Sequence, residues 1–107
     1  MYPKRYIVIV SIIKKTKEFD QWLKKLRDVK AKVHVIKRIA RIEFDNFGDH
    51  KSIGDSVSEI RIDYGPGYRI YYTKIKSVIV LLLIGGDKST QSRDIEKAKK
   101  LMKEYEV

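Results

Sequence analysis

An unbroken run of apolar residues, Val78 to Ile84, limits what this chain can fold into more than any other segment. Its seven residues are too few to cross a bilayer, because a membrane-spanning helix needs about 20 apolar residues. Apolar residues without polar alternation are typical of a strand in the interior of a sheet. Gly85, Gly86 and Asp87 follow and break the run. We therefore expect a sheet with this strand in its middle.

The segment before this strand has the pattern of a β-hairpin. From Val57 onward apolar and polar residues alternate with a period of two, which is typical of a strand with one buried face. The run Gly65-Pro66-Gly67 favours a turn, because proline presets its φ angle and glycine accepts positive φ. Residues 68–73 then form the return strand. A three-residue loop would gather the apolar side chains on one face, with these opposite pairs: Tyr64 with Tyr68, Ile62 with Ile70, and Ile60 with Tyr72.

Three helices and one further strand complete the expected fold. Thr16 and Asp28 are suitable N-caps for two consecutive helices, and a third helix follows Asp87. Residues 6–10 are apolar and largely β-branched, which predicts the first strand. The apolar positions expected to face the core are Phe19, Trp22, Leu23 and Leu26 in the first helix, Val29, Val33, Ile36 and Ala40 in the second, and Ile95, Ala98, Leu101, Met102 and Tyr105 in the third.

The order of these elements, β-α-α-β-β-β-α, places the chain in the α+β class. We expect a single domain over residues 1–107. In it, a mainly antiparallel sheet of about four strands carries an N-terminal helical hairpin and a C-terminal helix. The hydrophobic content of 43% excludes a disordered basic tail.

The charge of the chain points to a polyanionic partner. Lys and Arg number 24 against 14 Asp and Glu, a formal net charge of +10, which is typical of proteins that bind nucleic acid or the ribosome. Residues 1–51 hold 14 of the basic and 6 of the acidic side chains. The absence of cysteine excludes zinc ribbons and thiol chemistry. Two histidines without metal-ligand spacing predict neither a metal nor another cofactor.

The second face of the hairpin collects polar residues. They are Glu59, Arg61, Asp63, Arg69 and Tyr71. In the register given above, Asp63 lies opposite Arg69, and Arg61 lies opposite Tyr71. Two guanidiniums and a phenol on a flat, exposed sheet face suit a phosphate ligand. Cross-strand ion pairing on a solvated face explains the same residues equally well.

Basic residues also form a helical stripe and stand in two loops. The stripe consists of Lys30, His34, Lys37 and Arg41 in the second helix. It either contacts a phosphate backbone or is simply the solvated face of that helix. Lys51 stands in a polar loop beside His50, which is either a general base or incidental. Lys88 stands near the start of the last helix, where backbone N–H groups could bind an anion. The alternative is a glycine turn with Ser89 or Thr90 as the N-cap.

Five blocks of sequence occur in an order that points to one family. They are Phe19-x-x-Trp22-Leu23, Ile39-x-Arg41, Gly48-Asp49-x-Lys51-Ser52-Ile53-Gly54, the segment VSEIRIDYGPGYRIYY over 57–72, and Leu81-Leu82-x-x-Gly85-Gly86-Asp87-Lys88-Ser89-Thr90-Gln91-x-x-Asp94-Ile95-x-x-Ala98. With these blocks the chain resembles the addiction-module killer proteins, HigB-like toxins of the RelE/ParE superfamily. The resemblance covers roughly residues 15–105.

This resemblance implies a RelE-like fold and a type II toxin–antitoxin system. The toxin would act in the cytoplasm, away from membranes, and be held inactive in a hetero-oligomer by a cognate HigA-like antitoxin with a helix-turn-helix domain. RelE- and HigB-like members are endoribonucleases that cut mRNA on the ribosome without a metal, because the mRNA's own 2′-hydroxyl attacks the adjacent phosphate. ParE-type members share the fold but poison DNA gyrase and are not nucleases. A non-catalytic basic module that binds nucleic acid stays open as a third hypothesis.

The resemblance also implies roles for individual residues. Arg61 and Arg69 match the strand positions whose basic side chains meet the scissile phosphate, and Lys88 matches the basic position after the long strand. Tyr71 is a candidate for base stacking or proton transfer. Where several members carry the Tyr or His that serves as acid or base, this chain carries Gln91 and Asp94. The residues expected to contact the ribosome or RNA are Lys30, His34, Lys37, Arg41 and Lys51.

Overall fold

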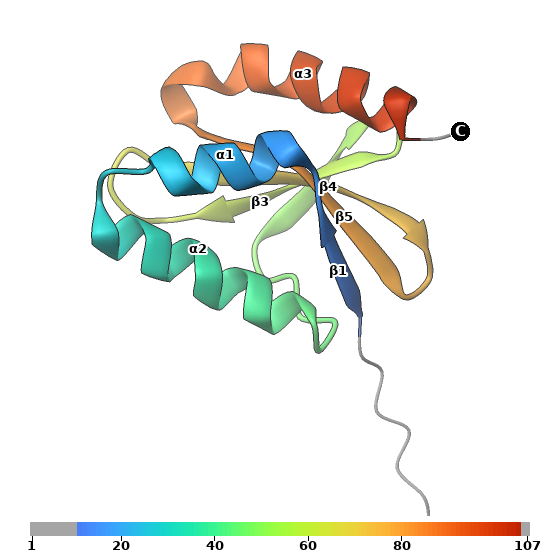
Figure 1. The fold of residues 1–107 in the computed structure, drawn as a ribbon, viewed down its shortest axis with the longest axis horizontal. Coiled ribbons are helices and arrows are strands. Elements are labelled where there is room, and N and C mark those ends of the chain that lie inside the picture. Colours follow the sequence, from blue (N-terminus) through green and yellow to red (C-terminus); the bar gives the residue numbers. More distant parts are fainter. Residues whose placement is uncertain (1–10, 106–107) are drawn as a thin grey trace, which may run out of the picture.

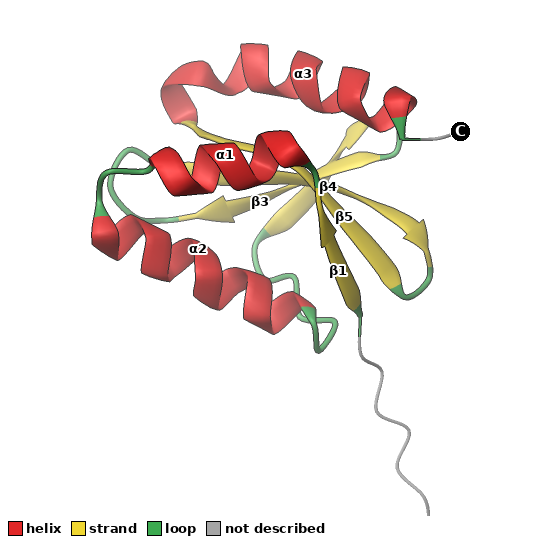
Figure 2. Ribbon diagram, viewed as in Figure 1, coloured by secondary structure: helices red, strands yellow, loops and turns green. Residues whose placement is uncertain are grey.

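The computed structural model of the protein describes residues 11–105. Figures 1 and 2 show how the helices and strands are arranged. In chain order the elements are β1 (Ile12–Lys15), α1 (Lys17–Lys25), α2 (Val29–Ile42), β2 (His50–Gly54), β3 (Val57–Ile62), β4 (Tyr68–Lys76), β5 (Ile79–Asp87), the 3₁₀ helix η1 (Lys88–Thr90) and α3 (Gln91–Glu104). The strand predicted over residues 6–10 lies outside the described residues.

The strands form one mixed sheet in the order β1-β5-β4-β3-β2. β1 runs parallel to β5, and the other neighbours are antiparallel. The α+β class and the C-terminal helix are therefore confirmed, but the expected sheet is corrected to five strands with one parallel pair. β1 and β2 escaped the sequence pattern because both are edge strands whose side chains are mostly exposed. Such strands carry no period-two apolar signal.

β5 contains the long apolar run and lies inside the sheet, between β1 and β4, as predicted. Val80 and Leu82 pack with α1 and α2, whereas Leu81 and Leu83 pack with α3. The sheet is thus covered on both faces, and Figure 1 shows α2 and α3 on opposite sides of the strands. This double coverage explains why the run has no polar alternation.

Both predicted N-caps are present. The hydroxyl of Thr16 accepts a hydrogen bond from the Phe19 backbone N–H at 2.9 Å and donates one to the Leu83 carbonyl at 2.6 Å. The Asp28 carboxylate accepts hydrogen bonds from the backbone N–H groups of Lys30 and Ala31. The two helices that these caps begin diverge from their short connection (Figure 1), so the expected helical hairpin is an open one.

The core stripe predicted for α2 is wrong. The predicted residues Val29, Val33, Ile36 and Ala40 are all exposed. The side chains that face the sheet and are fully buried are Ala31, Val35 and Ile42. Both stripes have helical spacing, so periodicity could not choose between them. On the buried side, the guanidinium of Arg38 donates to the Arg61 carbonyl at 2.7 Å and to the Phe47 carbonyl at 3.0 Å.

The hairpin register also differs from the prediction. β3 ends at Ile62, which lies opposite Tyr68, so five residues connect the strands instead of three. The opposite pairs are corrected to Ile62 with Tyr68, Ile60 with Ile70, and Ser58 with Tyr72. Tyr64 leaves the strand because its hydroxyl donates to Asp28 at 3.0 Å and its ring stacks on His34. A shift of two residues keeps every side chain on its predicted face.

Candidate functional site

Two arginines lie directly opposite each other on the sheet face that α3 covers. Arg61 of β3 pairs with Arg69 of β4, and the neighbouring pair is Glu59 with Tyr71. The predicted pairs, Asp63 with Arg69 and Arg61 with Tyr71, are therefore wrong. Like charges placed directly opposite across two strands repel each other. This pair therefore needs a compensating charge close by.

Glu59 supplies that charge. Its side chain is fully buried, with Oε2 3.7 Å from Nε of Arg61 and Oε1 3.7 Å from Nη1 of Arg69. Nε2 of Gln91, in the first turn of α3, donates to the same Oε1 at 3.4 Å. We name these residues and Tyr71 the arginine cluster. The pattern of the hairpin placed Glu59 on the right face but did not indicate that it neutralises both arginines.

Several polar atoms of the arginine cluster are buried without a hydrogen-bond partner. They are Nε of Arg61, Nε of Arg69, Oε2 of Glu59 and the hydroxyl of Tyr71. Buried polar groups are normally satisfied, so such a concentration in one place is unusual. The Arg61 side chain is 40% exposed and that of Arg69 is 12% exposed. The Arg61 side chain can therefore contact an anion that arrives from solvent. Arg69 is largely covered and adds positive charge beneath that contact.

Tyr71 is fully buried, which contradicts the expectation of a flat, exposed sheet face. Its buried ring offers no free face on which a base could stack. Burial, with Glu59 and Asp94 nearby, raises the pKa of the Tyr71 phenol well above its usual range. The phenol therefore stays protonated at neutral pH and can act as a hydrogen-bond donor.

Lys88 and Lys51 flank the arginine cluster. Lys88 is exposed as the first residue of η1, and its Cβ lies 3.7 Å from where a Cβ on Gly67, in the β3–β4 turn, would be. Lys51 of β2 is exposed and lies opposite Glu59, so it shares the face of the arginine cluster. His50 pairs with Ile60 and contacts Phe47, so it lies on the other sheet face.

The turn before α3 differs in detail from the prediction. The carboxylate of Asp87 caps η1 by accepting from the backbone N–H of Ser89 at 2.8 Å. Thr90 precedes α3 but makes no side-chain cap hydrogen bond, since its hydroxyl donates to Asp94. The cap is therefore the carboxylate of Asp87, and not the predicted hydroxyl of Ser89 or Thr90.

The basic stripe of α2 lies apart from the arginine cluster. All four of its members are exposed: Lys30, His34, Lys37 and Arg41. α2 packs on the sheet face opposite to α3, so the stripe and the cluster point to different sides of the molecule. The structure therefore brings together Arg61, Arg69 and Tyr71, with Lys51 and Lys88 at the margin, and leaves the α2 stripe separate.

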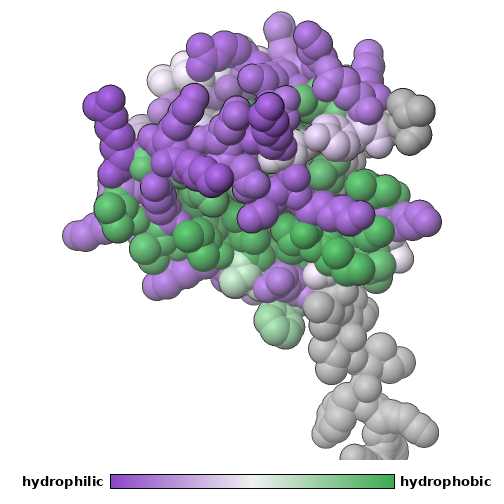
Figure 3. All heavy atoms as spheres, in the orientation of Figure 1, coloured by the Kyte–Doolittle hydropathy of each residue, from purple (hydrophilic) through white to green (hydrophobic). Residues whose placement is uncertain are grey.

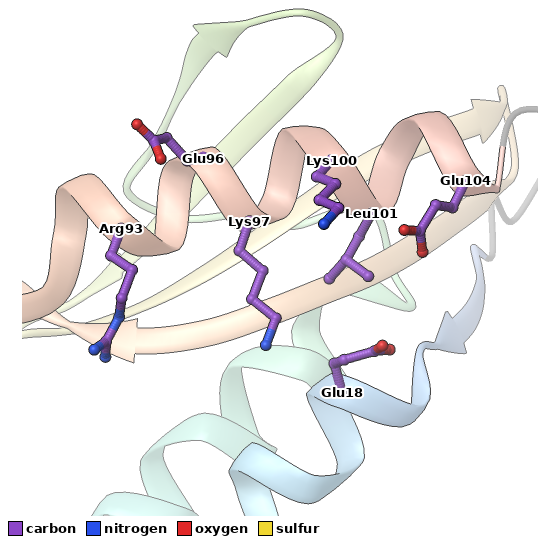
Figure 4. A pocket seen from close by; sticks show the side chains of 7 residues that line it. All are labelled: Glu18, Arg93, Glu96, Lys97, Lys100, Leu101 and Glu104. Carbon is purple, nitrogen blue, oxygen red and sulfur yellow. The ribbon is translucent and has the colours of Figure 1, made fainter.

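Two hollows lie near the ends of α1 and α3. One, of about 590 Å³, is bordered by Trp22, Gly85 and Gly86, and no residue of the arginine cluster lines it. Trp22 packs against Gly85 here and Asp94 against Gly86, so neither glycine has room for a side chain. The other hollow, shown in Figure 4, is about 420 Å³ and lies between α1 and α3. Its charged lining is balanced, three acidic and three basic side chains, and gives no net attraction for a polyanion: Glu18, Arg93, Glu96, Lys97, Lys100 and Glu104.

Within residues 11–105, no helix has both the length and the apolar character needed to cross a membrane. Across the same residues, no three His, Asp or Glu side chains are grouped so that they could hold a metal ion.

An uncharacterized protein of Haemophilus influenzae (strain Rd) is 52% identical to the chain over 92 residues, which are 86% of the chain and 93% of that protein. The chain belongs to the same family as that protein. No protein-family model matches the sequence.

Among solved structures, an arginine-to-alanine double mutant of the Escherichia coli toxin RelE in its free state is similar to the chain. The TM-score is 0.70, and the match covers 85% of this chain and 96% of the other. Sequence identity is 17%, so the likeness concerns the fold. The chain thus has a RelE-like α+β fold.

Proposed function

We propose that the chain is the toxin of a type II toxin–antitoxin system, a HigB-like endoribonuclease that cuts mRNA on the ribosome without a metal. The observation that carries the proposal is the directly opposed pair Arg61 and Arg69, joined by the buried Glu59, on a RelE-like fold. Two guanidiniums at fixed positions suit a phosphate that gains charge during a reaction.

The proposed reaction is attack of the mRNA 2′-hydroxyl on the adjacent phosphate, followed by departure of the 5′-oxygen. Arg61, whose side chain is 40% exposed, would contact the phosphate. Arg69, held at its back by Glu59, would add charge that stabilises the phosphorane-like transition state. Lys88, exposed as the first residue of η1, would help to hold the RNA. Tyr71 lies beside the two arginines as a buried neutral phenol without a hydrogen-bond partner, and we assign it no step of the reaction.

The wider basic surface would guide the toxin to the ribosome. The exposed residues proposed for contact with RNA are Lys30, His34, Lys37, Arg41 and Lys51. The net charge of +10 favours association with RNA at a rate that falls as salt concentration rises. In the cytoplasm, a cognate HigA-like antitoxin with a helix-turn-helix domain would hold the toxin inactive in a hetero-oligomer.

One observation favours a different function, binding without catalysis. Arg69 is only 12% exposed and Tyr71 is fully buried, so Arg61 is the one member of the opposed pair that solvent reaches freely. A ParE-type gyrase poison or a basic nucleic-acid-binding module would need no more than that. We prefer the nuclease because one buried carboxylate, Glu59, holds both guanidiniums at 3.7 Å and so keeps two cations close together.

Mapping of mRNA 5′ ends after induced expression in bacteria tests the proposal. We expect growth arrest with new 5′ ends inside translated messages, and both effects should disappear in Arg61→Ala and Arg69→Ala. Arg27→Ala is a matched control, because Arg27 is exposed in the loop between α1 and α2. Arrest with an SOS response and no cleavage would support the gyrase poison instead. Full toxicity of both arginine variants would refute the site.

A further inference from the structure

The end of β5 has a free edge. β1 ends at Lys15, which pairs with Leu82, whereas β5 runs on beyond that pair. The Leu83 carbonyl accepts a hydrogen bond from the Thr16 hydroxyl, and within residues 11–105 no strand pairs with residues 84–87 on that side. Such an edge presents backbone N–H and C=O groups without partners. A short stretch of backbone therefore offers both hydrogen-bond donors and acceptors.

This edge borders the hollow of about 590 Å³, which we name the β5 groove. Residues 84–87 line it, together with side chains of α1 and α3. Trp22 lies against Gly85 and Asp94 against Gly86, and successive strand residues point to opposite faces of a sheet. The free edge is therefore enclosed from both faces of β5. The volume is typical of a site for a small molecule.

The lining of the β5 groove is partly aromatic. The half-buried Trp22 contacts Tyr68 edge to face, with ring centroids 6.5 Å apart, and both residues line the groove. Leu26 and Ile84 add apolar surface. Bases of single-stranded RNA are bound by this combination, in which apolar or aromatic side chains contact the ring and polar groups contact its edge.

Two cations of α3 also line the β5 groove. They are Arg93 and Lys97, and Figure 4 shows both side chains extending from α3 on the side where α1 lies. Within the described part of the chain, neither forms an ion pair with a carboxylate. Figure 3 shows mostly hydrophilic atoms over the upper part of the molecule, where Figure 1 places α1 and α3. These cations are therefore available to a phosphate.

The two carboxylates that line the β5 groove are already engaged. Asp87 accepts hydrogen bonds from the backbone N–H and the hydroxyl of Ser89. Asp94 accepts from the hydroxyl of Thr90 and is only 6% exposed. The exposed charges of the groove are therefore positive, in contrast to the glutamates that line the neighbouring hollow.

A nucleotide fits these features better than a peptide strand. The free edge comprises only residues 84–87, so an added strand would gain few backbone hydrogen bonds. A peptide also brings no group that matches two neighbouring cations as a phosphate does. Among the bases, a purine has the larger ring and contacts more of the aromatic and apolar lining than a pyrimidine.

We propose that the β5 groove binds a purine nucleotide, with its base at the free edge of β5 beside Trp22 and its phosphate on Arg93 and Lys97. The inference deepens the proposed function and rests on it for one point, that the nucleotide belongs to the mRNA near the cut. Gly86 of the groove is the cross-strand partner of Arg69, and Lys88 directly follows Asp87. A free nucleotide has the same chemistry and is the alternative source.

Trp22 is the single tryptophan of the chain, so its fluorescence reports on the β5 groove. Titration of the full chain with AMP or GMP should quench this fluorescence to saturation. Adenosine, which lacks the phosphate, should bind at least about tenfold more weakly than AMP, and CMP should also bind more weakly.

Variants on α3 test the phosphate contact. Arg93→Gln and Lys97→Gln should each weaken the Kd for AMP by roughly three- to tenfold, and both positions are exposed, so the variants should fold normally. Lys103→Gln, at an exposed lysine of α3 that does not line the groove, is the matched control and should leave the Kd unchanged.

Three results would overturn the inference. One is a fluorescence signal that no nucleotide changes, and another is equal affinity for AMP and adenosine in the protein and in both α3 variants. The third is saturable quenching by a capped peptide of alternating valine and threonine while nucleotides have no effect, because the groove would then bind a strand.

Mapping of mRNA 5′ ends separates the two sources of the nucleotide. If the mRNA supplies it, Arg93→Gln and Lys97→Gln should flatten the preference for a purine beside the cut while cleavage continues, and Lys103→Gln should not. If AMP binds as expected and the base preference stays the same, the ligand is a free nucleotide. If AMP binds and the chain cuts no mRNA, the nuclease fails and the nucleotide site stands.

Discussion

At the scale of single residues, the buried carboxylate of Glu59 makes the site possible. Arg61 and Arg69 are direct cross-strand partners, and without a counter-charge their guanidiniums would repel each other. Glu59 contacts both at 3.7 Å, one with each oxygen, while Gln91 holds it from α3. We therefore regard Glu59 as a positioning residue that sets the distance between two cations.

Glu59→Gln removes this charge with almost no change in shape. We expect the free energy of unfolding to fall by roughly 1–3 kcal/mol, less than for a fully buried pair because solvent reaches Arg61. Urea denaturation of the purified protein measures it. Glu96→Gln, at an exposed position of α3, is the control and should change stability by less than about 0.5 kcal/mol. Equal effects of the two variants would mean that Glu59 does not hold the arginines.

Tyr71→Phe removes a buried hydroxyl that has no hydrogen-bond partner. We expect the free energy of unfolding at neutral pH to stay unchanged or to rise by about 1 kcal/mol, since a buried polar atom is lost without losing a hydrogen bond. Thr73→Val is the contrasting variant, because the Thr73 hydroxyl donates to the Ser56 carbonyl at 2.7 Å. It should lower stability by about 1 kcal/mol. A clear loss of stability in Tyr71→Phe would show that the hydroxyl has a partner after all.

The raised pKa of Tyr71 also predicts how stability depends on pH. The folded chain holds the phenolic proton more tightly than the unfolded chain, whose value is near 10.0. The contribution of this tighter proton binding to the free energy of unfolding is therefore complete below pH 10. It is lost as the pH rises from 10 towards the pKa of Tyr71 in the folded chain. In a comparison of thermal unfolding between pH 8 and 11, the protein should lose more stability than Tyr71→Phe. Parallel curves for the two proteins would contradict this cause.

At the scale of elements, Thr16 joins α1 to the sheet. Its hydroxyl caps α1 and also donates to a carbonyl of β5, although the side chain is only 1% exposed. Thr16→Ala should lower the free energy of unfolding by about 2–3 kcal/mol, because a cap is lost and a buried carbonyl is left unpaired. Thr16→Ser keeps the hydroxyl and should recover most of that loss. If Ser is no better than Ala in urea denaturation, the hydroxyl is not what matters.

The elements differ in how much the sequence could predict about them. Residues 79–84 of β5 and the two caps were predictable, because an unbroken apolar run is typical of an interior strand and Thr or Asp before a helix is typical of an N-cap. β2 was not, since an exposed edge strand made of His50 to Gly54 has no pattern of its own. α2 carries two apolar stripes of equal spacing, and only the packed structure shows which one faces the sheet.

The sequence pattern also predicted part of the candidate site. Period-two alternation placed Arg61 and Arg69 on one face, and a register error of two residues could not change that. The error did hide that the two arginines are direct cross-strand partners. It arose because Tyr64 leaves the strand to contact Asp28 and His34, which are remote in sequence. The burial of Glu59 and Tyr71 depends on α3 and could not be read from the hairpin.

At the scale of the whole molecule, the two faces of the sheet present different groups of basic residues. The face under α3 holds the arginine cluster, and the opposite face carries α2 with its basic stripe. Residues 1–51, which include α2, hold 14 basic and 6 acidic side chains. The proposed guidance to RNA therefore concerns mainly the first half, while the opposed arginines lie in the second.

The central claim is that the opposed arginines cut mRNA on the ribosome. Purified protein mixed with ribosomes that translate a defined mRNA tests it, with the cleaved message followed over time. We predict cleavage of the translated message, none of the free mRNA, and rates at least about 100-fold lower for Arg61→Ala and Arg69→Ala, with Arg27→Ala unchanged. An intact message under translation, or equal cleavage by the arginine variants, would contradict the account.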